Sequence, residues 1–271
     1  EIAQCLVGSE MCIRDRYSIT QTPLNEQDLK TMSEAVEVLR QFKGFSYFTE
    51  MSDIINRLED HVASARMKTT PIIDFEKNES LKGLDYLDTI YHAIVNEHPI
   101  QLKYRSFKAR SANSFIFYPY LLKEYRNRWF VYGVRGNGRI LQNLALDRIQ
   151  SLEVLPQEHY IKNTFFDPNT FFDDLVGVTK NSGSVAEKIG FKVAAAEAPY
   201  IITKPIHRSQ QVVERLADGS VILEIEVVIN HELERVFFGY AEGIQVLYPK
   251  TLVELMGRKL KKAAEQYTHS K

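Results

Sequence analysis

The chain has 271 residues, of which 44% are hydrophobic and 25% charged, a composition typical of a folded globular protein large enough for two domains. It contains no apolar run long enough to cross a bilayer and no pattern of a secretory leader, so a membrane partner is not expected. The net charge of −1 is uneven: residues 101–150 carry ten basic and two acidic side chains, a net charge of +8. A basic island in an otherwise acidic chain indicates an anionic ligand.

The N-terminal segment has no helical or strand period. Residues 5–16, CLVGSEMCIRDR, resemble a translated sequencing-adapter fragment, and we expect residues 1–16 to be non-native. The two cysteines, Cys5 and Cys12, lie in this segment and provide neither a disulfide framework nor a zinc spacing. A reducing, cytoplasmic location is therefore expected.

Helical spacing of apolar residues predicts three helices before residue 100. The first runs over residues 25–42, where Asn25 and Asp28 have the spacing of a capping box, and the second over residues 52–65. The third has Leu84, Leu87, Tyr91 and Ile94 on its inner face and ends near Pro99. We assign residues 17–78 to a helical linker region.

From Ile100 the apolar period changes to two. Five short strands are predicted at residues 101–107, 113–120, 128–134, 139–144 and 151–155, with a hairpin turn at Asn137-Gly138. Five strands within about 55 residues favour a small SH3/Sm-like five-stranded β-barrel. With the third helix they form a predicted domain over residues 79–158.

A second α+β unit is predicted over residues 185–268. Its strands fall at residues 187–194, 211–216, 221–229 and 244–248, and its helices at residues 199–203 and 233–240. The order βαββαβ is a ferredoxin-like pattern. A closing helix begins at Thr251.

Three segments carry a resemblance to the WYL family of transcription regulators. The first is LKYRSF (102–107) with FYPYLLKEYRNRWFVYGV (117–134), where Trp129-Phe130-Val131 stands in place of the family's Trp-Tyr-Leu triplet. The second is LALDRIQSLEVL (144–155), with the Asp-Arg-Ile ending of the family. The third, DGSVILEIEV with GIQVLYPKTLVELM, resembles the extension that follows the WYL domain in these regulators.

The resemblance implies the effector-sensing portion of a bacterial transcription regulator that acts as a homodimer. The family usually carries an N-terminal helix-turn-helix, and the residues before Tyr17 are too few to form one. We therefore expect contact with duplex DNA only through a helix-turn-helix absent from this chain, and tighter binding to single strands than to duplexes.

The resemblance also places a ligand site of polar and basic residues near these strands. Strand alternation puts Arg128, Phe130 and Tyr132 on one face of their strand. The expected ligand-binding residues are Tyr104, Arg105, Ser106, Arg128, Phe130, Tyr132, Arg139 and Arg148. Guanidinium groups hold phosphates and aromatic rings stack bases, so the expected effector is a single-stranded nucleic acid or a nucleotide.

Two alternatives stay open at this stage. The basic residues can simply form a solvated face, and Arg148 can be paired structurally with Asp147. The aromatic surface can also be a protein-interaction or dimerisation module without a small ligand, although interface cores are depleted of lysine. Phosphate-loop, nucleophile-elbow and metal-ligand motifs are missing, so we expect neither an enzyme nor a cofactor.

Overall fold

The computed structural model describes residues 82–136, 138 and 140–268. Its contacts divide the chain into two compact units, residues 1–77 and residues 78–271, and the description below concerns the second. The N-terminal segment and the two helices expected at residues 25–42 and 52–65 lie outside the described residues. Among the residues that are described, no helix is long and apolar enough to span a membrane.

The helix expected before residue 100 is α4, Leu87–Val95, preceded by a 3-10 turn at Leu84–Tyr86. Its fully buried side chains are Leu87, Ile90 and Ala93, which recur every three residues and face the neighbouring sheet. Of the inner-face residues expected from the sequence, Leu87 is buried, whereas Tyr91 and Ile94 are only partly covered.

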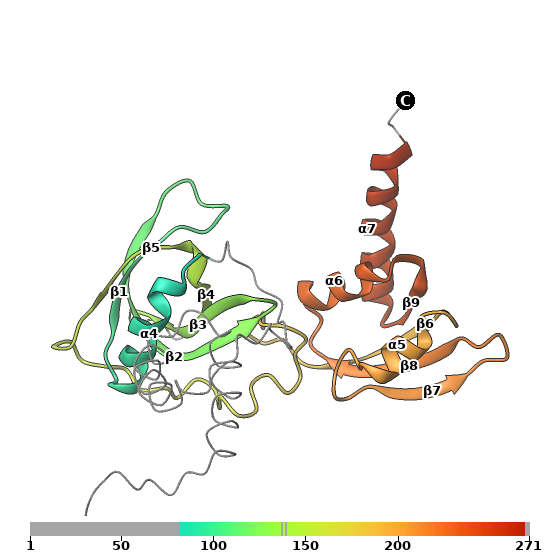
Figure 1. The fold of residues 1–271 in the computed structure, drawn as a ribbon, viewed down its shortest axis with the longest axis horizontal. Coiled ribbons are helices and arrows are strands. Elements are labelled where there is room, and N and C mark those ends of the chain that lie inside the picture. The colour runs from blue at the N-terminus through green and yellow to red at the C-terminus, as the bar shows by residue number, and fades with distance from the viewer. Residues whose placement is uncertain (1–81, 137, 139, 269–271) are drawn as a thin grey trace, which may run out of the picture. The chain divides into compact units, whose positions relative to one another are not determined.

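The first sheet contains five antiparallel strands in the order β4-β3-β2-β1-β5 (Figure 1). Their bounds are β1 Ile100–Tyr104, β2 Asn113–Tyr125, β3 Arg128–Arg135, β4 Leu141–Ala145 and β5 Ile149–Val154. The long strand β2 serves two partners. Its first residues, up to Phe117, pair with β1, and its residues from Phe117 onward pair with β3. The register shifts between Pro119 and Leu121, and such a bulge bends the strand.

The expectation of a closed barrel is wrong. Within residues 82–136, 138 and 140–268, β4 and β5 stand at opposite edges of the sheet and are not paired. The chain passes from β4 to β5 through a 3-10 turn, Leu146–Arg148, flanked by extended residues. This turn leads β5 onto β1, where Ile100–Tyr104 take up its backbone hydrogen bonds. The sheet therefore stays open.

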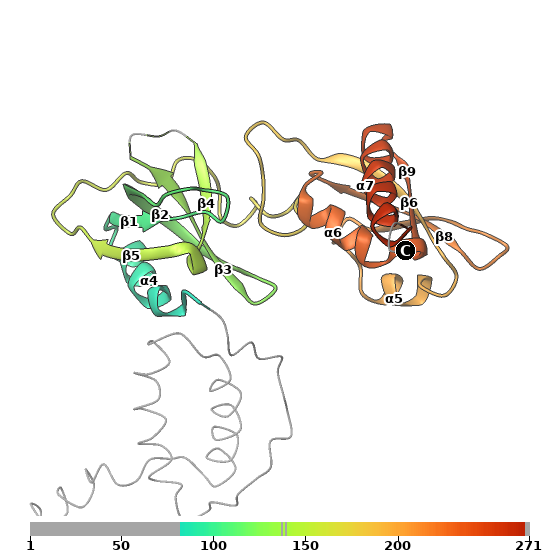
Figure 2. The ribbon, with the colours of Figure 1, turned by 90° about the horizontal axis from the view of Figure 1, so that it is seen from above.

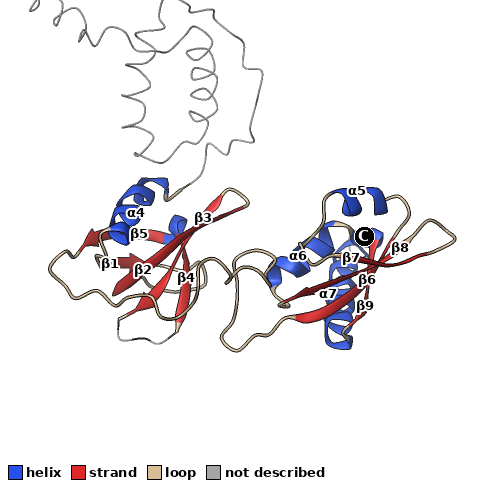
Figure 3. Cartoon of the chain, turned by 90° about the horizontal axis from the view of Figure 1, so that it is seen from below, coloured by secondary structure: helices blue, strands red, loops and turns tan. Residues whose placement is uncertain are grey.

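The second sheet has four antiparallel strands in the order β7-β8-β6-β9 (Figures 2 and 3). The elements follow the predicted βαββαβ order: β6 Glu187–Val193, α5 Ala198–Thr203, β7 Gln211–Arg215, β8 Val221–Val227, α6 His231–Gly239 and β9 Ile244–Tyr248, with α7 Lys250–Thr268 closing the chain. Alternate residues of β6 and β8 are buried. They share one core with Ile201 of α5, Phe237 of α6 and Leu252 of α7.

The linker between the sheets, residues 155–186, is well packed although it contains no helix or strand. Its aromatic residues Tyr160, Phe165 and Phe166 cover Tyr118 and Tyr120 of β2. The rings of Tyr120 and Phe165 are stacked with centroids 6.1 Å apart. The linker therefore completes the apolar cover of the first sheet.

Candidate ligand-binding cleft

A two-residue turn, Arg126–Asn127, joins β2 to β3. Both residues have positive φ angles, 50° and 60°, as hairpin turns of the primed types require. The Asn127 amide donates to Glu124 Oε1 at 2.5 Å, which holds the turn. Asparagine tolerates this backbone region, whereas arginine is strained in it. Strained residues cluster at functional sites, and both residues of this turn line a cleft.

The cleft has a volume of about 420 Å³. Its walls come from β2, β3, β4, the linker and the first turns of α6. The lining residues are the arginines Arg126, Arg128, Arg148 and Arg235, the aromatic residues Tyr125 and Phe130, the polar residues Asn127, Asn143, Thr179, His231 and Glu232, and the small residues Ala145 and Val178. A lining that combines four arginines with two aromatic residues matches the chemistry of phosphate and base recognition.

Asp147 holds two of these arginines. Arg128 Nε lies 3.2 Å from Asp147 Oδ2, and Arg148 Nε lies 3.8 Å from Asp147 Oδ1. The second distance is too long for a hydrogen bond. The ion pair between Asp147 and Arg148 that the sequence left open is present at this longer distance. One carboxylate, however, faces two guanidinium groups. The excess charge leaves the cleft positive.

Arg148 also contacts two residues that follow β1 or end it. Its guanidinium lies over the Phe107 ring, 4.6 Å from the centroid. Burial raises the pKa of Tyr104, and the neighbouring Arg148 charge acts in the opposite direction. Tyr104 is therefore a neutral hydroxyl beside a cation, able to donate or accept a hydrogen bond.

The residues predicted from the sequence are distributed unevenly. Arg128, Phe130 and Arg148 line the cleft, and Tyr104 touches it through Arg148. Arg105 and Ser106 lie beyond the end of β1; the Arg105 amide donates to the Arg148 carbonyl at 3.2 Å, but neither residue lines the cleft. Arg139 lies outside the described residues.

Tyr132 occupies the core instead of the cleft. Its side chain is 2% exposed, packed against Phe166, Phe171 and Phe172 of the linker. Its hydroxyl donates to the Val178 carbonyl, and burial raises its pKa. Strand alternation correctly predicts that Tyr132 lies on the same face of β3 as Arg128 and Phe130. The linker, however, covers the part of this face that carries Tyr132.

Sequence reasoning missed the contribution of α6 to the cleft. Asn230 caps this helix: its Oδ1 accepts from the Leu233 amide, and its Nδ2 donates to the carbonyls of Val176 and Thr179, all at 2.9 Å. The cap therefore fixes the linker against the start of α6, which brings Glu232 and Arg235 to the cleft. The sequence did contain a signal for this helix: Asn230 is followed by Glu232 and Glu234, a pattern typical of a helix start.

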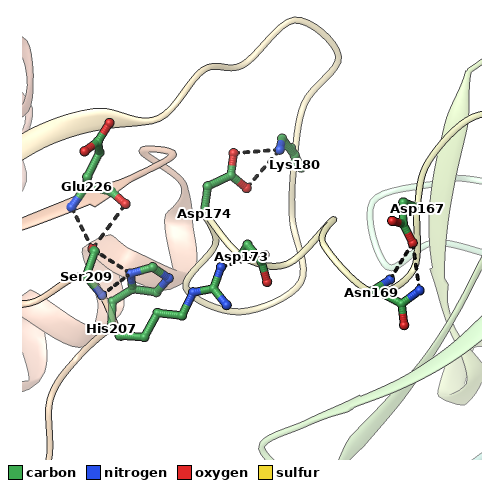
Figure 4. A network of polar contacts seen from close by, with 9 residues as sticks. Asp167, Asn169, Asp173, Asp174, Lys180, His207, Ser209 and Glu226 are labelled. Atoms are coloured by element: carbon green, nitrogen blue, oxygen red, sulfur yellow. Dashed lines mark hydrogen bonds and ion pairs between the residues drawn. The ribbon is translucent and has the colours of Figure 1, made fainter.

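Further polar contacts involve the linker and the segment that follows α5 (Figure 4). Lys180 Nζ lies 2.7 Å from Asp174 Oδ2, and Arg208 reaches Asp173 at 2.6 Å. Ser209 bridges to the backbone of Glu226 in β8, accepting from its amide at 2.9 Å. The Lys180–Asp174 and Arg208–Asp173 ion pairs hold linker residues on either side of Val178 and Thr179, which line the cleft.

Comparison with known proteins gives matches for both sheets. The WYL domain model matches residues 85–154, and the WCX domain model matches residues 186–264. The chain belongs to the WYL-domain family. Its WYL domain consists of α4 and the first sheet, and its WCX domain of the second sheet with helices α5 to α7.

Two solved structures are similar in part. Proteasome accessory factor B/C (PafBC) of Arthrobacter aurescens is 16% identical, with a TM-score of 0.32, over 76% of this chain and 30% of that one. A CRISPR Cas-related protein is 11% identical, with a TM-score of 0.41, over 69% of this chain and 52% of that one. This chain thus spans about a third to a half of their lengths, and at these TM-scores neither structure bears on function. No curated protein matches.

Proposed function

We propose that this chain is the effector-sensing portion of a bacterial transcription regulator and that its cleft binds a single-stranded nucleic acid or a nucleotide. The observation that carries the proposal is the convergence of Arg126, Arg128, Arg148 and Arg235 with Tyr125 and Phe130 on one cleft. Its volume of about 420 Å³ falls in the range of sites for small ligands. The match to the WYL and WCX domains supports a role in regulation.

The walls of the cleft suggest how binding is relayed. Of the lining residues, Arg128 and Arg148 belong to the WYL domain and Arg235 to the WCX domain. A ligand that contacts both groups stabilises the arrangement in which they converge. A ligand shifts a conformational equilibrium only through such differential contacts. We propose that this shift changes the DNA affinity of a DNA-binding part of the regulator.

The test is a titration of a fluorescently labelled single-stranded oligonucleotide, followed by anisotropy at several salt concentrations. We expect Arg128→Gln to weaken binding about tenfold or more, the effect of a lost charge-assisted hydrogen bond, and to reduce the salt dependence by about 0.7 in log–log slope, the value for one phosphate contact. Arg215→Gln, an exposed arginine of β7, is the matched control and leaves binding unchanged. Equal affinities for Arg128→Gln and the wild type would remove the cleft as the site.

Self-association is a separate part of the proposal. The second half of α7, residues 257–268, is exposed over its whole length, and Leu260 and Tyr267 are 43% and 86% exposed. We expect a homodimer, as regulators of palindromic operators usually are. Light scattering at tens of micromolar checks this, and a monomer there would contradict it.

A further inference from the structure

A buried carboxylate stands among the arginines of the cleft. Glu232 lies in the first turn of α6, and its side chain is 6% exposed. Its Oε1 accepts from Thr179 Oγ1 at 2.7 Å and lies 3.3 Å from His231 Nε2. Its Oε2 is buried and has no hydrogen-bond partner among the described residues. Buried polar atoms are nearly always hydrogen-bonded, so we expect a bound ligand to donate a hydrogen bond to this oxygen.

The surrounding backbone makes room for this side chain. Gly177 has a φ angle of 92°, and a Cβ there would lie 2.5 Å from Glu232 Cγ. No other residue fits both the backbone angle and the close approach. The Asn230 cap holds the same linker segment through the carbonyls of Val176 and Thr179. Gly177 therefore leaves the space that the Glu232 side chain occupies, and the Asn230 cap keeps the linker in position beside it.

The carboxylate is also kept apart from the guanidinium groups. Within the part of the chain that the structure describes, the only ion-pair partner within 4 Å of Glu232 is His231, whereas Arg128 and Arg148 face Asp147. The cleft thus offers two separate functions: cations for an anionic group, and a carboxylate for N–H donors, with Oε2 unpaired among the described residues and Oε1 able to accept a second hydrogen bond besides that from Thr179. A complementary ligand carries phosphate at one end and N–H donors at the other.

We propose that Glu232 reads the Watson–Crick edge of a guanine base, so that the effector is a guanine nucleotide, free or within a single strand. This deepens, and rests on, the function proposed above. An ionised carboxylate only accepts hydrogen bonds. Guanine alone presents two adjacent donors, N1–H and N2–H, on that edge; in adenine, cytosine and thymine each donor is flanked by an acceptor, which the carboxylate repels. Tyr125 and Phe130 supply rings for stacking the base.

Competition against a labelled single strand tests this. One arm compares an all-thymine hexamer with hexamers that carry one guanine or one inosine; the other compares GMP with AMP, CMP and UMP. A good base contact discriminates by 1–3 kcal/mol, about 5- to 150-fold. We expect guanine to bind at least about fivefold tighter than thymine, and inosine, which lacks the N2 amino group, to lose most of this advantage. Competition by GMP would identify the effector as a free guanine nucleotide. Competition by the guanine hexamer alone would identify it as a single strand that contains guanine.

Glu232→Gln removes the preference for guanine in this account, because its amide nitrogen donates where an acceptor is required. Glu242→Gln, an exposed residue, is the control and retains the preference. The inosine comparison uses the unaltered protein, so it stands even if Glu232→Gln does not fold. Equal binding of the guanine, inosine and thymine hexamers, with binding still sensitive to Arg128→Gln, would overturn the role of Glu232 and leave the proposed function intact. No binding of any strand or nucleotide would overturn both.

Discussion

Asn143 Nδ2 donates to the carbonyl oxygen of Val178 at 2.7 Å, and the hydroxyl of Tyr132 donates to the same oxygen. Two side chains of neighbouring strands, β4 and β3, thus hold one carbonyl of the linker. Val178 is also one of the residues that line the cleft. The WYL sheet therefore fixes the linker from one side as Asn230 fixes it from the other.

The shared acceptor predicts non-additive mutations. Tyr132→Phe or Asn143→Ala alone leaves Val178 with one donor and costs about 1 kcal/mol of unfolding free energy. The double variant leaves a buried carbonyl unpaired, so its cost exceeds the sum of the two by about 1 kcal/mol. Urea denaturation measures all three, with the exposed Tyr267→Phe as control. Strict additivity would show that the two donors do not share this acceptor in solution.

The Asn230 cap is expected to be a major contributor to stability. Asn230→Ala removes one helix cap, worth about 1 kcal/mol, and two hydrogen bonds to linker carbonyls, worth about 1 kcal/mol each. The expected loss of about 2–3 kcal/mol corresponds to a fall in Tm of roughly 5–10 °C for a unit of this size. Asn169→Ala, which removes an exposed contact with Asp167, shifts Tm by less than about 2 °C. Similar Tm changes for the two variants would refute this role of the cap.

The strained turn predicts a conflict between stability and binding. Arg126 has a φ angle of 50°, which glycine adopts without strain. We expect Arg126→Gly to keep the unfolding free energy or raise it by up to about 1 kcal/mol, while weakening the binding of single strands. Asn127→Gly, at the neighbouring position, has little effect on stability because asparagine tolerates this region. A destabilised Arg126→Gly variant that binds normally would contradict the account.

Much of this architecture could be predicted from the sequence, because strand alternation and helical spacing record which residues face a core. The nine strands of the described residues lie close to their expected places on this basis. Closure of the first sheet could not be predicted, because alternation does not report which edges pair, and β5 joins β1 instead of β4. Arg128 and Arg148 were predicted from their charge and from the family resemblance, and Phe130 from strand alternation, which puts it on the face of Arg128. Glu232 was missed because its burial depends on Gly177, 55 positions earlier in the chain.

Stability is expected to fall at alkaline pH. Burial, with a smaller effect of Tyr118, raises the pKa of Tyr120 to about 12, and burial also raises the pKa values of Tyr132 and Tyr160. Unfolded tyrosine ionises near pH 10. The unfolded state therefore loses protons that the folded state retains, and the free energy of unfolding decreases as the pH rises above about 10. Tyr120→Phe is expected to reduce the fall of the unfolding free energy with pH between about pH 10 and 12. Urea denaturation over this pH range measures it, and an unchanged pH dependence would contradict the contribution of Tyr120.

The central claim is that the arginine-lined cleft holds the effector. A crystal structure of the protein with a bound single-stranded hexamer containing one guanine tests it most directly. The account predicts phosphate oxygens within hydrogen-bond distance of the Arg128 and Arg148 guanidinium groups and a base between the rings of the cleft. A strand bound to another surface, with the cleft holding no part of it, would contradict the account.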